Sequence, residues 1–565
     1  MLDAISVRTT ATGCRWVPLA ARPSTTGHPR LPAIVDRLLA GRGIATPDEA
    51  ERFLRAELAS VHDPLLLPDM PRALDRLARA IRAGEMIAVF GDFDVDGITA
   101  TAILVEAIAA LGGHALPYLP DRFREGYGPN AAAFSSLSAQ GVGLIVTVDC
   151  GISAAAEIGH ASTLGVDVIV LDHHNVPPRL PAAIAVIDPK REGCTYPWPE
   201  LCAGGLAYKL AGALAAHLGN DRYDPAAHLD LAGLATVCDM VPLQDENRWL
   251  ARRGLAALAR TARPGLIEMA RIGGFDLRAA DSDLFAFRIG PRLNATGRLD
   301  HARLAYELLT TRDPARAKEL ALAIERLNHN RRSATARAIA LVEELLADEG
   351  SLWPLVFTGH EAIPEGIVGL VAGRLAETYR LPAVVYHRGE EHSRGSVRGV
   401  PGFDVHAALQ AAAPLLLRQG GHRQAGGFTV ATKNLPALRE VLAGIAAQSL
   451  AETDNAPTLA YDTTIDLETD ADVLLKWRQF LGPFGVGNPE PLLLARDLEV
   501  CEARAVGDGT HLRLRLRAGT RVWNAIAFRL AHAAPPVGAR IDALLHVRPG
   551  RNGAPDLHVR DLARC

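Results

Sequence analysis

The amino-acid sequence lacks any run of about 18 uncharged apolar residues, so it predicts no membrane-spanning helix and no contact with a membrane. The first residues, MLDAISVRTTATGC, contain no apolar block behind a basic start and therefore do not predict a secretory signal. The 7 cysteines are scattered and form no CxxC pair. This spacing favours reduced thiols in a cytoplasmic protein over disulfides, zinc sites or iron–sulfur clusters.

The sequence also lacks GxSxG and GxxxxGK[ST], so it predicts neither a serine-hydrolase elbow nor a phosphate-binding P-loop. The formal net charge of −4 argues by itself against a nucleic-acid partner, but residues 501–565 carry 11 arginines and only 5 acidic residues. This basic segment is compatible with binding to a phosphate backbone, and equally with a basic surface that binds nothing.

The chain of 565 residues is too long for one hydrophobic core, and about 100–200 residues per domain predict roughly three or four domains. Between residues 71 and 301, short apolar runs such as IAVF, LIVTV and VIVL alternate with helical patterns such as 99–111. Buried runs of this length, followed by helices, predict an α/β domain built on a parallel sheet. We interpret residues 1–70 as an N-terminal extension packed on that first domain.

Three further regions are predicted after the first domain. Residues 302–349, rich in Ala, Leu, Arg and Glu, are typical of linker helices, and residues 350–450 repeat the α/β pattern. AETDNAP (451–457) is typical of a loop between domains. From 456 to 565, segments such as HLRLRLR (511–517) alternate apolar and polar residues between glycine-rich turns, which predicts a small β-barrel.

Acidic and histidine residues follow the apolar runs of the first domain. GDFDVDG (91–97) follows IAVF, Asp149 follows LIVTV, the triplet that begins at Asp172 follows VIVL, and Asp239 ends a fourth apolar stretch. We interpret all four positions as strand ends. Since ligands of open α/β sheets bind beyond the carboxyl ends of the strands, these side chains are predicted to share one site.

Carboxylates packed this closely are unfavourable unless a cation neutralises them. Hard oxygen ligands suit Mg²⁺ or Mn²⁺, and a histidine among them favours Mn²⁺ as readily as Mg²⁺. The cluster has enough carboxylates for two ions about 3.5–4 Å apart, which could activate a water and stabilise a leaving oxygen. A solvated acidic turn or a satisfied histidine pair would explain any one motif, but four such sites in one domain favour a metal centre.

The motifs GDFDVDG, VDCG, DHH and CDMVPL, in this order, resemble the signature of the DHH phosphoesterase superfamily. Further motifs are similar to its RecJ branch, the single-strand-specific 5′→3′ DNA exonucleases: PDRFREGYG (120–128), IGPRLNATGR (289–298), GSVRGVPGFDV (395–405), GGHRQAGG (420–427) and FGVGNPEP (484–491). The resemblance implies an α/β DHH domain over 71–301, linker helices over 302–349, a second α/β, DHH-associated domain over 350–450 and an oligonucleotide-binding (OB-like) β-barrel over 456–565.

The resemblance also implies roles for individual residues. The implied metal ligands are Asp92, Asp94, Asp96, Asp149, His173 and Asp239. The implied catalytic residues are Asp94, Asp96, Asp149, His173, His174 and Asp239, with His174 acting near the scissile phosphate. The implied substrate-binding residues are Arg122, Arg298, Ser396, Arg398 and His422.

Within the substrate-binding set, Arg298, Ser396 and Arg398 would form a pocket for a 5′-terminal phosphate, and Arg292 is the alternative to Arg298. Arginine suits this role because its planar guanidinium matches two phosphate oxygens. Many members of the superfamily carry a histidine where this chain has Phe90, and Asp92 is the residue that could take its place as a ligand.

The leading hypothesis is a metal-dependent exonuclease that hydrolyses single-stranded DNA from a 5′ end, in recombination and repair. The barrel would follow the strand, with Trp477, Trp523 and Phe528 as candidate stacking residues. The alternatives are an oligonucleotide or cyclic-dinucleotide phosphodiesterase of the DHH superfamily, a non-catalytic DNA-binding scaffold, and a haloacid-dehalogenase-like phosphatase. The resemblance implies a single-strand-binding protein and a helicase as partners, and we expect a cytoplasmic monomer.

Overall fold

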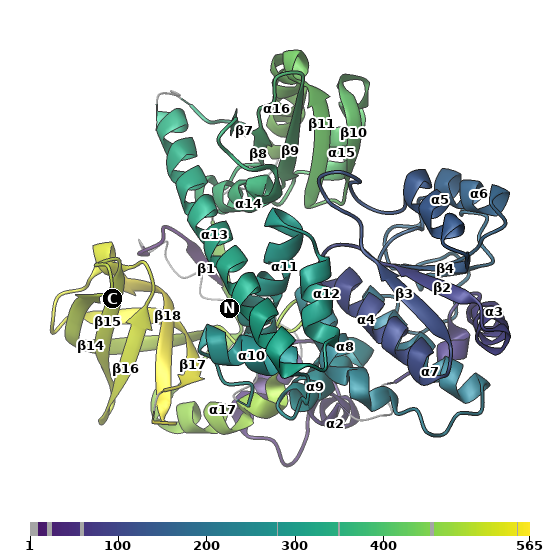
Figure 1. Ribbon diagram of the computed structural model, residues 1–565. Helices are drawn as coiled ribbons and strands as arrows, with labels where there is room; N and C mark the ends of the chain where they lie inside the picture. Colours follow the sequence, from purple (N-terminus) through teal and green to yellow (C-terminus); the bar gives the residue numbers. More distant parts are fainter. Residues whose placement is uncertain are drawn as a thin grey trace.

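The computed structural model describes residues 10–19, 25–56, 61–278, 281–347, 351–451, 457–550 and 552–564. In Figure 1, two α/β domains (blue and green) and a β-barrel (yellow) surround the long helix α13 (Pro314–Ala347). Among the helices of these ranges, none combines the length and the apolar character needed to cross a bilayer.

The first domain contains the predicted parallel sheet. Its five strands lie in the order β3-β2-β4-β5-β6, and every neighbouring pair is parallel. The strand bounds are β2 Met86–Phe90, β3 His114–Tyr118, β4 Val142–Val148, β5 Asp167–Leu171 and β6 Ala185–Ile187. Almost every residue of β2, β4 and β5 is buried, which agrees with their uninterrupted apolar runs.

Helices cover both faces of this sheet. One face packs on α4 (Val95–Ala110) and α7 (Ala203–His217), and the other packs on α5 (Ala131–Ala139) and α6 (Ala155–Thr163). The remaining helices are α3 Met70–Ala83, α8 Leu229–Cys238, α9 Asp245–Leu258 and α10 Pro264–Gly273. The helix predicted at 99–111 begins earlier, at Val95, because the Asp94 side chain caps it.

Three helices lead from the first domain to the second. They are α11 (Gly290–Leu299), α12 (Arg303–Thr310) and α13, and a π-helical turn over Leu284–Ile289 precedes them. The second domain has a sheet in the order β10-β11-β9-β8-β7, in which only β7 and β8 are parallel. Its bounds are β7 Val356–His360, α14 Val368–Tyr379, β8 Ala383–His387, β9 His392–Arg398, α15 Val405–Ala411, β10 Leu416–Gly421, β11 Ala425–Ala431 and α16 Leu435–Ala451.

The C-terminal strands form the predicted closed β-barrel. Strand β14 pairs with both β15 and β17, so the sheet β13-β14-β15-β16-β18-β17 closes on itself. The bounds are β13 Thr463–Thr464, α17 Leu467–Leu481, β14 Leu493–Val506, β15 His511–Ala518, β16 Arg521–Ala527, β17 Arg540–Pro549 and β18 Pro555–Arg564. Leu512, Leu514 and Leu516 of β15 point into the barrel, and the alternating arginines are exposed.

The expectation that the N-terminal extension packs on the first domain holds only for its last residues, because Leu67 and Met70 lie in the core of that domain while the earlier described residues pack mainly on the barrel. Strand β1 (Arg15–Pro18) pairs in parallel with β12 (Thr458–Tyr461), and helices α1 (Ala33–Gly41) and α2 (Pro47–Arg55) share one hydrophobic core with α17 and the barrel. An apolar helix face indicates burial but not the surface that covers it, so the sequence could not choose between the two domains. Most of the loop predicted at 451–457 lies outside the described residues.

Candidate metal centre and phosphate pocket

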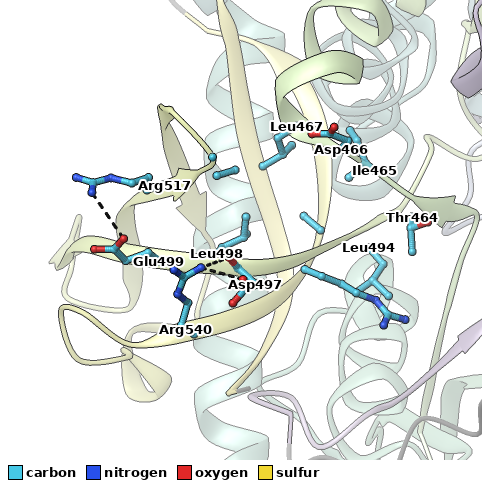
Figure 2. Close-up of a pocket in the computed structure, with 14 residues that line it drawn as sticks. Thr464, Ile465, Asp466, Leu467, Leu494, Asp497, Leu498, Glu499, Arg517 and Arg540 are labelled. Carbon is cyan, nitrogen blue, oxygen red and sulfur yellow. Dashed lines mark hydrogen bonds and ion pairs between the residues drawn. The ribbon is translucent and has the colours of Figure 1, made fainter.

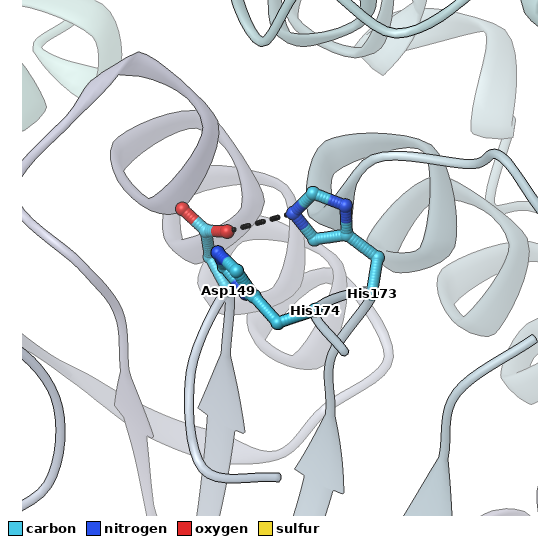
Figure 3. Close-up of side chains that lie close together, drawn as sticks. All are labelled: Asp149, His173 and His174. Carbon is cyan, nitrogen blue, oxygen red and sulfur yellow. Dashed lines mark hydrogen bonds and ion pairs between the residues drawn. The ribbon is translucent and has the colours of Figure 1, made fainter. Parts of the chain in front are cut away.

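Three of the acidic and histidine motifs follow adjacent parallel strands and meet at one edge of the first sheet. GDFDVDG follows β2, Asp149 follows β4 and the DHH triplet follows β5. Nε2 of His173 lies 3.1 Å from Oδ1 of Asp149, and the close-up in Figure 3 shows this contact beside His174. The predicted grouping of these motifs therefore exists in the folded chain.

Asp239 joins the same group from a different kind of element. Its Oδ2 lies 3.7 Å from Nε2 of His173, and Oδ2 of Asp96 lies 3.6 Å from that nitrogen. However, Asp239 ends helix α8 and not a strand, so its interpretation as a strand end is wrong. Residues 230–237 of α8 are buried all round, which removes the helical periodicity that would have distinguished this run from a buried strand.

Backbone amides hold two of the acidic side chains in place. Oδ1 of Asp94 accepts hydrogen bonds from the amides of Asp96 and Gly97, at 3.0 and 3.2 Å. The two carboxylate oxygens of Asp96 each accept a 2.7 Å bond from α7, one from the amide of Ala203 and one from that of Gly204. Asp96 therefore sits at a helix N-terminus, which favours negative charge.

Glycines let these loops approach closely. A Cβ at Gly97 would lie 2.5 Å from the backbone nitrogen of Asp92, so this glycine is required by a close approach of two backbone segments. A Cβ at Gly204 would lie 2.4 Å from that of Ala235 and 3.2 Å from Oδ1 of Asp96. The sequence motif LCAGG around Gly204 was not predicted to support the site.

Without a bound cation, the carboxylates of the acidic cluster repel one another. Burial and the neighbouring carboxylates raise the pKa of Asp96 to about 7 and raise the pKa values of Asp92, Asp149 and Asp239 well above their usual range. Oδ1 of Asp92 is buried and has no hydrogen-bond partner among the described residues. A cation would satisfy this oxygen and relieve the repulsion.

The donor set fits divalent metal ions. Three groups each bring their ligand atoms within 4.8 Å of one another: Asp92, Asp94 and Asp149; Asp96, His173 and Asp239; and Asp149, His173 and His174. Burial and the charge of His174 lower the pKa of His173 to about 3, so its imidazole is neutral and able to donate a lone pair. Oxygen-rich groups that include one neutral imidazole suit Mn²⁺ or Mg²⁺.

Asp172 was predicted to lie at the site but was given no role there, and in the structure it orients the histidines. Its Oδ1 accepts bonds from the amides of His173 and His174 and lies 2.7 Å from Nδ1 of His174. Burial opposes its charge, yet the hydrogen bond and positive charge of His174 lower the pKa of Asp172 to about 2. The first residue of the DHH triplet was the available signal for this role.

A group of arginines lies beside the acidic cluster. Arg122 follows β3, Arg298 lies in α11 and Arg398 ends β9, so three separate segments contribute. Enclosure and the charges of Arg122, Arg331 and Arg398 lower the pKa of Arg298 to about 9. Within the described residues, Arg122, Arg298 and Arg398 form no ion pair with a carboxylate. Such a cluster is suited to an anion.

Ser396 lies within this arginine group. Nη1 of Arg398 donates to Oγ of Ser396 at 2.7 Å, and a Cβ at Gly369 would lie 2.8 Å from the guanidinium of Arg398. Arg292 has a different environment, because its Nε donates to Glu325 at 2.6 Å. The geometry therefore leaves Arg298 available for a phosphate and commits Arg292 to an ion pair.

His422 reaches the metal centre from the second domain. Its ring stacks on that of His174, with a centroid distance of 5.3 Å and an interplanar angle of 16°. Nδ1 of His422 also lies 3.5 Å from Nδ2 of Asn175. The turn between β10 and β11 therefore contacts the DHH triplet directly, through the residue that the resemblance implies for substrate binding.

Helix α11 supports the GDFDVDG loop as well as carrying Arg298. Oδ1 of Asn294 accepts a 3.1 Å hydrogen bond from the amide of Val95. A Cβ at Gly297 would lie 2.5 Å from the carbonyl oxygen of Phe93. Neither Asn294 nor Gly297 was predicted to have this role, although both lie in the motif IGPRLNATGR.

The candidate stacking residues of the barrel differ in exposure. Phe528 is 55% exposed and lies edge-on to His511 and His558, whereas Trp523 is buried. Trp477 packs against Phe480. Of the three candidates, Phe528 has the most accessible ring.

A separate hollow of about 970 Å³ lies between α17 and the barrel strands. Figure 2 shows ion pairs for two of its arginines, Arg540 with Asp497 at 2.9 Å and Arg517 with Glu499 at 3.7 Å, and the third arginine of the lining, Arg496, is matched in number by Asp466. Because these charges are balanced within the protein, the hollow lacks the uncompensated positive charge of the arginine group near the metal centre.

Three parts of the chain match known families. Residues 86–236 match the N-terminal domain of the DHH family, residues 353–448 match the DHHA1 domain and residues 461–552 match the RecJ OB domain. These matches fall on the first α/β domain, the second α/β domain and the barrel.

Curated relatives cover most of the chain. It is 36% identical over 508 residues to the single-stranded-DNA-specific exonuclease RecJ of Bacillus subtilis, a match that spans 89% of this chain and 64% of that protein. It is 33% identical over 525 residues to the protein of the same name from Dickeya dadantii, spanning 88% and 90% of the two chains.

Solved structures agree with these sequence matches. The crystal structure of RecJ in complex with Mn²⁺ from Thermus thermophilus superimposes with a TM-score of 0.81 at 30% identity, covering 97% of this chain and 78% of that one. The complex of the same protein with Mg²⁺ gives a TM-score of 0.74 at 28% identity, covering 97% and 77%.

Proposed function

This chain belongs to the RecJ family of DHH phosphoesterases, and we propose that it is a metal-dependent exonuclease that digests single-stranded DNA from a 5′ end. The observation that supports the proposal most strongly is the pairing of two complementary groups. Buried carboxylates that need cations lie beside arginines that need an anion. The terminal phosphate of a DNA strand would bind the arginines, and the neighbouring phosphodiester would bind the cations held by the carboxylates.

The proposed metal ligands are Asp92, Asp94, Asp96, Asp149, His173 and Asp239, which would hold two Mn²⁺ or Mg²⁺ ions. When bound, the ions would lower the pKa of a water and neutralise charge on the attacked phosphate and the leaving oxygen. The amides of Ala203 and Gly204 keep the Asp96 carboxylate oriented toward this site.

His174 has a separate role beside the scissile phosphate. Although burial opposes protonation, the hydrogen bond and charge of Asp172 raise the pKa of His174. A protonated imidazole there donates a hydrogen bond to a phosphate oxygen and stabilises negative charge as it develops. His422, stacked on this ring, restricts its orientation.

The arginine group explains attack from an end. Arg298, Arg398 and Ser396 would bind the 5′-terminal phosphate, and Arg122 lies between that pocket and the acidic cluster, with its guanidinium carbon 4.7 Å from the centre of the Phe93 ring. A phosphate anchored at a fixed distance from the metal ligands brings the first linkages of a free end into register. An internal segment has no terminal phosphate to anchor.

The barrel would hold the rest of the strand. Arg513 and Arg515 project from β15, and Phe528 presents an exposed ring near the end of β16. Phosphate contacts and base stacking of this kind bind single strands with little dependence on sequence. We further propose that the protein acts as a cytoplasmic monomer in recombination and repair, with a helicase and a single-strand-binding protein.

Digestion of an oligonucleotide labelled at one end tests the proposal. Purified protein with Mn²⁺ or Mg²⁺ should release the label of a 5′-labelled single strand at once, as a mononucleotide. The same strand labelled at its 3′ end should shorten progressively, and a blunt duplex should resist. Preferred cleavage of dinucleotides would instead support an oligonucleotide phosphodiesterase, and binding without cleavage would support a scaffold.

A further inference from the structure

The loop of residues 484–490, between α17 and β14, contacts the segment that follows Asp239. The amide of Leu243 donates a 2.7 Å hydrogen bond to the carbonyl of Val486, and Nε2 of Gln244 donates a 2.8 Å bond to the carbonyl of Gly487. These bonds join the C-terminal part of the chain to a segment only four and five residues beyond a proposed metal ligand.

Close packing reinforces the two hydrogen bonds. Gly487 adopts a φ of +72°, and a Cβ there would lie 3.0 Å from Cβ of Pro242. A Cβ at Gly485 would lie 2.7 Å from Cδ1 of Leu243, whose side chain is buried. The loop therefore fits against this segment with no space for larger residues.

The segment after Asp239 needs outside support. Met240 and Asp245, at its two ends, adopt left-handed backbone conformations, with φ of 61° and 44°. Residues other than glycine adopt this region at an energetic cost and remain in it only where the surroundings hold them. The hydrogen bonds from the loop 484–490 provide part of that restraint.

The same loop also contacts the segment that leads to α11. Oγ of Ser282 donates a 2.5 Å hydrogen bond to the carbonyl of Phe484. Next to it, Arg548 of β17 pairs with both Glu490 of the loop and Asp283, the latter at 3.0 Å. The segment 281–289 runs directly into the helix that carries Arg298.

We propose that the loop 484–490 is a positioning element of the nuclease site, which holds Asp239 for metal binding and Arg298 for phosphate binding. One short loop thus contacts both the segment that follows Asp239 and the segment that leads to the helix carrying Arg298. In this view the C-terminal domain shapes the active site as well as binding the strand. The activity measurements of the test rest on the proposed function, whereas its metal-binding measurement does not.

Variants of the loop contacts and variants of the exposed barrel face distinguish positioning of the nuclease site from binding of the DNA strand. Gln244→Ala removes the bond to Gly487, and Gly487→Ala places a strained Cβ against Pro242. The matched controls are Phe528→Ala and Arg515→Ala on the exposed face of the barrel, far along the chain from these contacts. Circular dichroism and thermal denaturation establish that each purified full-length variant is folded.

Binding of Mn²⁺ in the absence of DNA is the decisive measurement. The electron paramagnetic resonance signal of the free ion reports how much Mn²⁺ remains unbound. Loss of a residue that orients a metal ligand typically weakens binding by about 10–100-fold, so Gln244→Ala and Gly487→Ala should shift the Mn²⁺ dissociation constant by roughly tenfold or more. Phe528→Ala and Arg515→Ala should leave Mn²⁺ binding unchanged and weaken only the binding of long single strands.

Ser282→Ala tests the phosphate side. It should lower the ratio of rates on 5′-phosphorylated and 5′-hydroxyl tetranucleotides, while long-strand affinity stays near that of the unmodified protein. Wild-type Mn²⁺ affinity in both Gln244→Ala and Gly487→Ala would overturn the inference. A protein that binds Mn²⁺ as expected but cleaves no DNA would instead refute the proposed function and leave the metal-binding result intact.

Discussion

Nδ1 of His174 lies 2.7 Å from Oδ1 of Asp172. Both residues belong to the DHH triplet after β5, and the His174 ring stacks on His422 of the second domain. Since the pKa of Asp172 is about 2, the carboxylate is ionised and the imidazole must be the donor. The pair therefore places a proton on Nδ1 of His174 and leaves Nε2 as the nitrogen that does not bind Asp172.

Replacing Asp172 by Asn should lower kcat by about 10–100-fold, the usual range for a partner that orients a catalytic or ligand histidine. Without the carboxylate the pKa of His174 falls, so the protonated form is lost at a lower pH. The alkaline limb of the kcat–pH profile should shift to lower pH. A profile of unchanged shape would show that Asp172 acts only through folding.

Asp149→Ala should reduce cleavage by about 10³-fold or more while leaving single-strand binding measurable, because the arginine and barrel contacts remain. Asp149 has a φ of 62°, a region that Asn tolerates better than Ala. Asp149→Asn is therefore the matched variant that removes the charge with the backbone conformation kept. Equal losses of binding and of rate in both variants would contradict the proposed separation of roles.

Arg398→Ala should reduce the preference for a 5′-phosphate over a 5′-hydroxyl end. A hydrogen bond to a charged group contributes about 1.5–3 kcal/mol, which corresponds to roughly ten- to a hundredfold in the ratio of kcat/KM values. Arg292→Ala is the control, because Arg292 is paired with Glu325. It should lower Tm without changing the ratio, and an unchanged ratio in Arg398→Ala would remove that residue from the pocket.

The raised pKa values of the acidic cluster predict how pH and metal affect stability. The pKa of Asp96 rises from 3.8 in its ordinary state to about 7 in the folded chain, and those of Asp92, Asp149 and Asp239 also rise. The folded state thus binds more protons than the unfolded state. The free energy of unfolding of the metal-free protein therefore decreases as the pH rises from the ordinary pKa of these carboxyls to their raised pKa values.

Thermal denaturation between pH 6.5 and 8 checks this prediction, with Asp149→Asn as the control for ordinary histidines, which also titrate near pH 6.5. In EDTA, Tm should fall as the pH rises. The increase in Tm on adding Mn²⁺ should be larger at pH 8 than at pH 6.5, since protons compete with the metal for the same oxygens. Metal-free Asp149→Asn should show a smaller dependence on pH, and an equal Mn²⁺ effect at both pH values would refute the account.

Local patterns were sufficient to predict most elements of the site. IAVF, LIVTV and VIVL predicted buried parallel strands, and the residues just after them met at one sheet edge because parallel strands end on the same side. HLRLRLR predicted an alternating barrel strand for the same kind of reason, since side chains of a strand alternate between its faces.

The same local reasoning did not predict contacts between distant segments. Asp239 was assigned to a strand, because a helix buried on every side has no polar face to reveal its period. The role of FGVGNPEP in supporting the Asp239 segment was not foreseen, because a hydrogen bond between Leu243 and Val486 joins residues from opposite halves of the chain.

The sequence by itself determined the kind of most elements and the chemistry of their polar residues, because periodicity and side-chain type are local properties. Only the tertiary structure decided which of Arg292 and Arg298 is held in an ion pair, which domain covers helices α1 and α2, and which loop contacts the segment after Asp239. These outcomes depend on which surfaces pack together, and the free energy of that packing belongs to the whole chain.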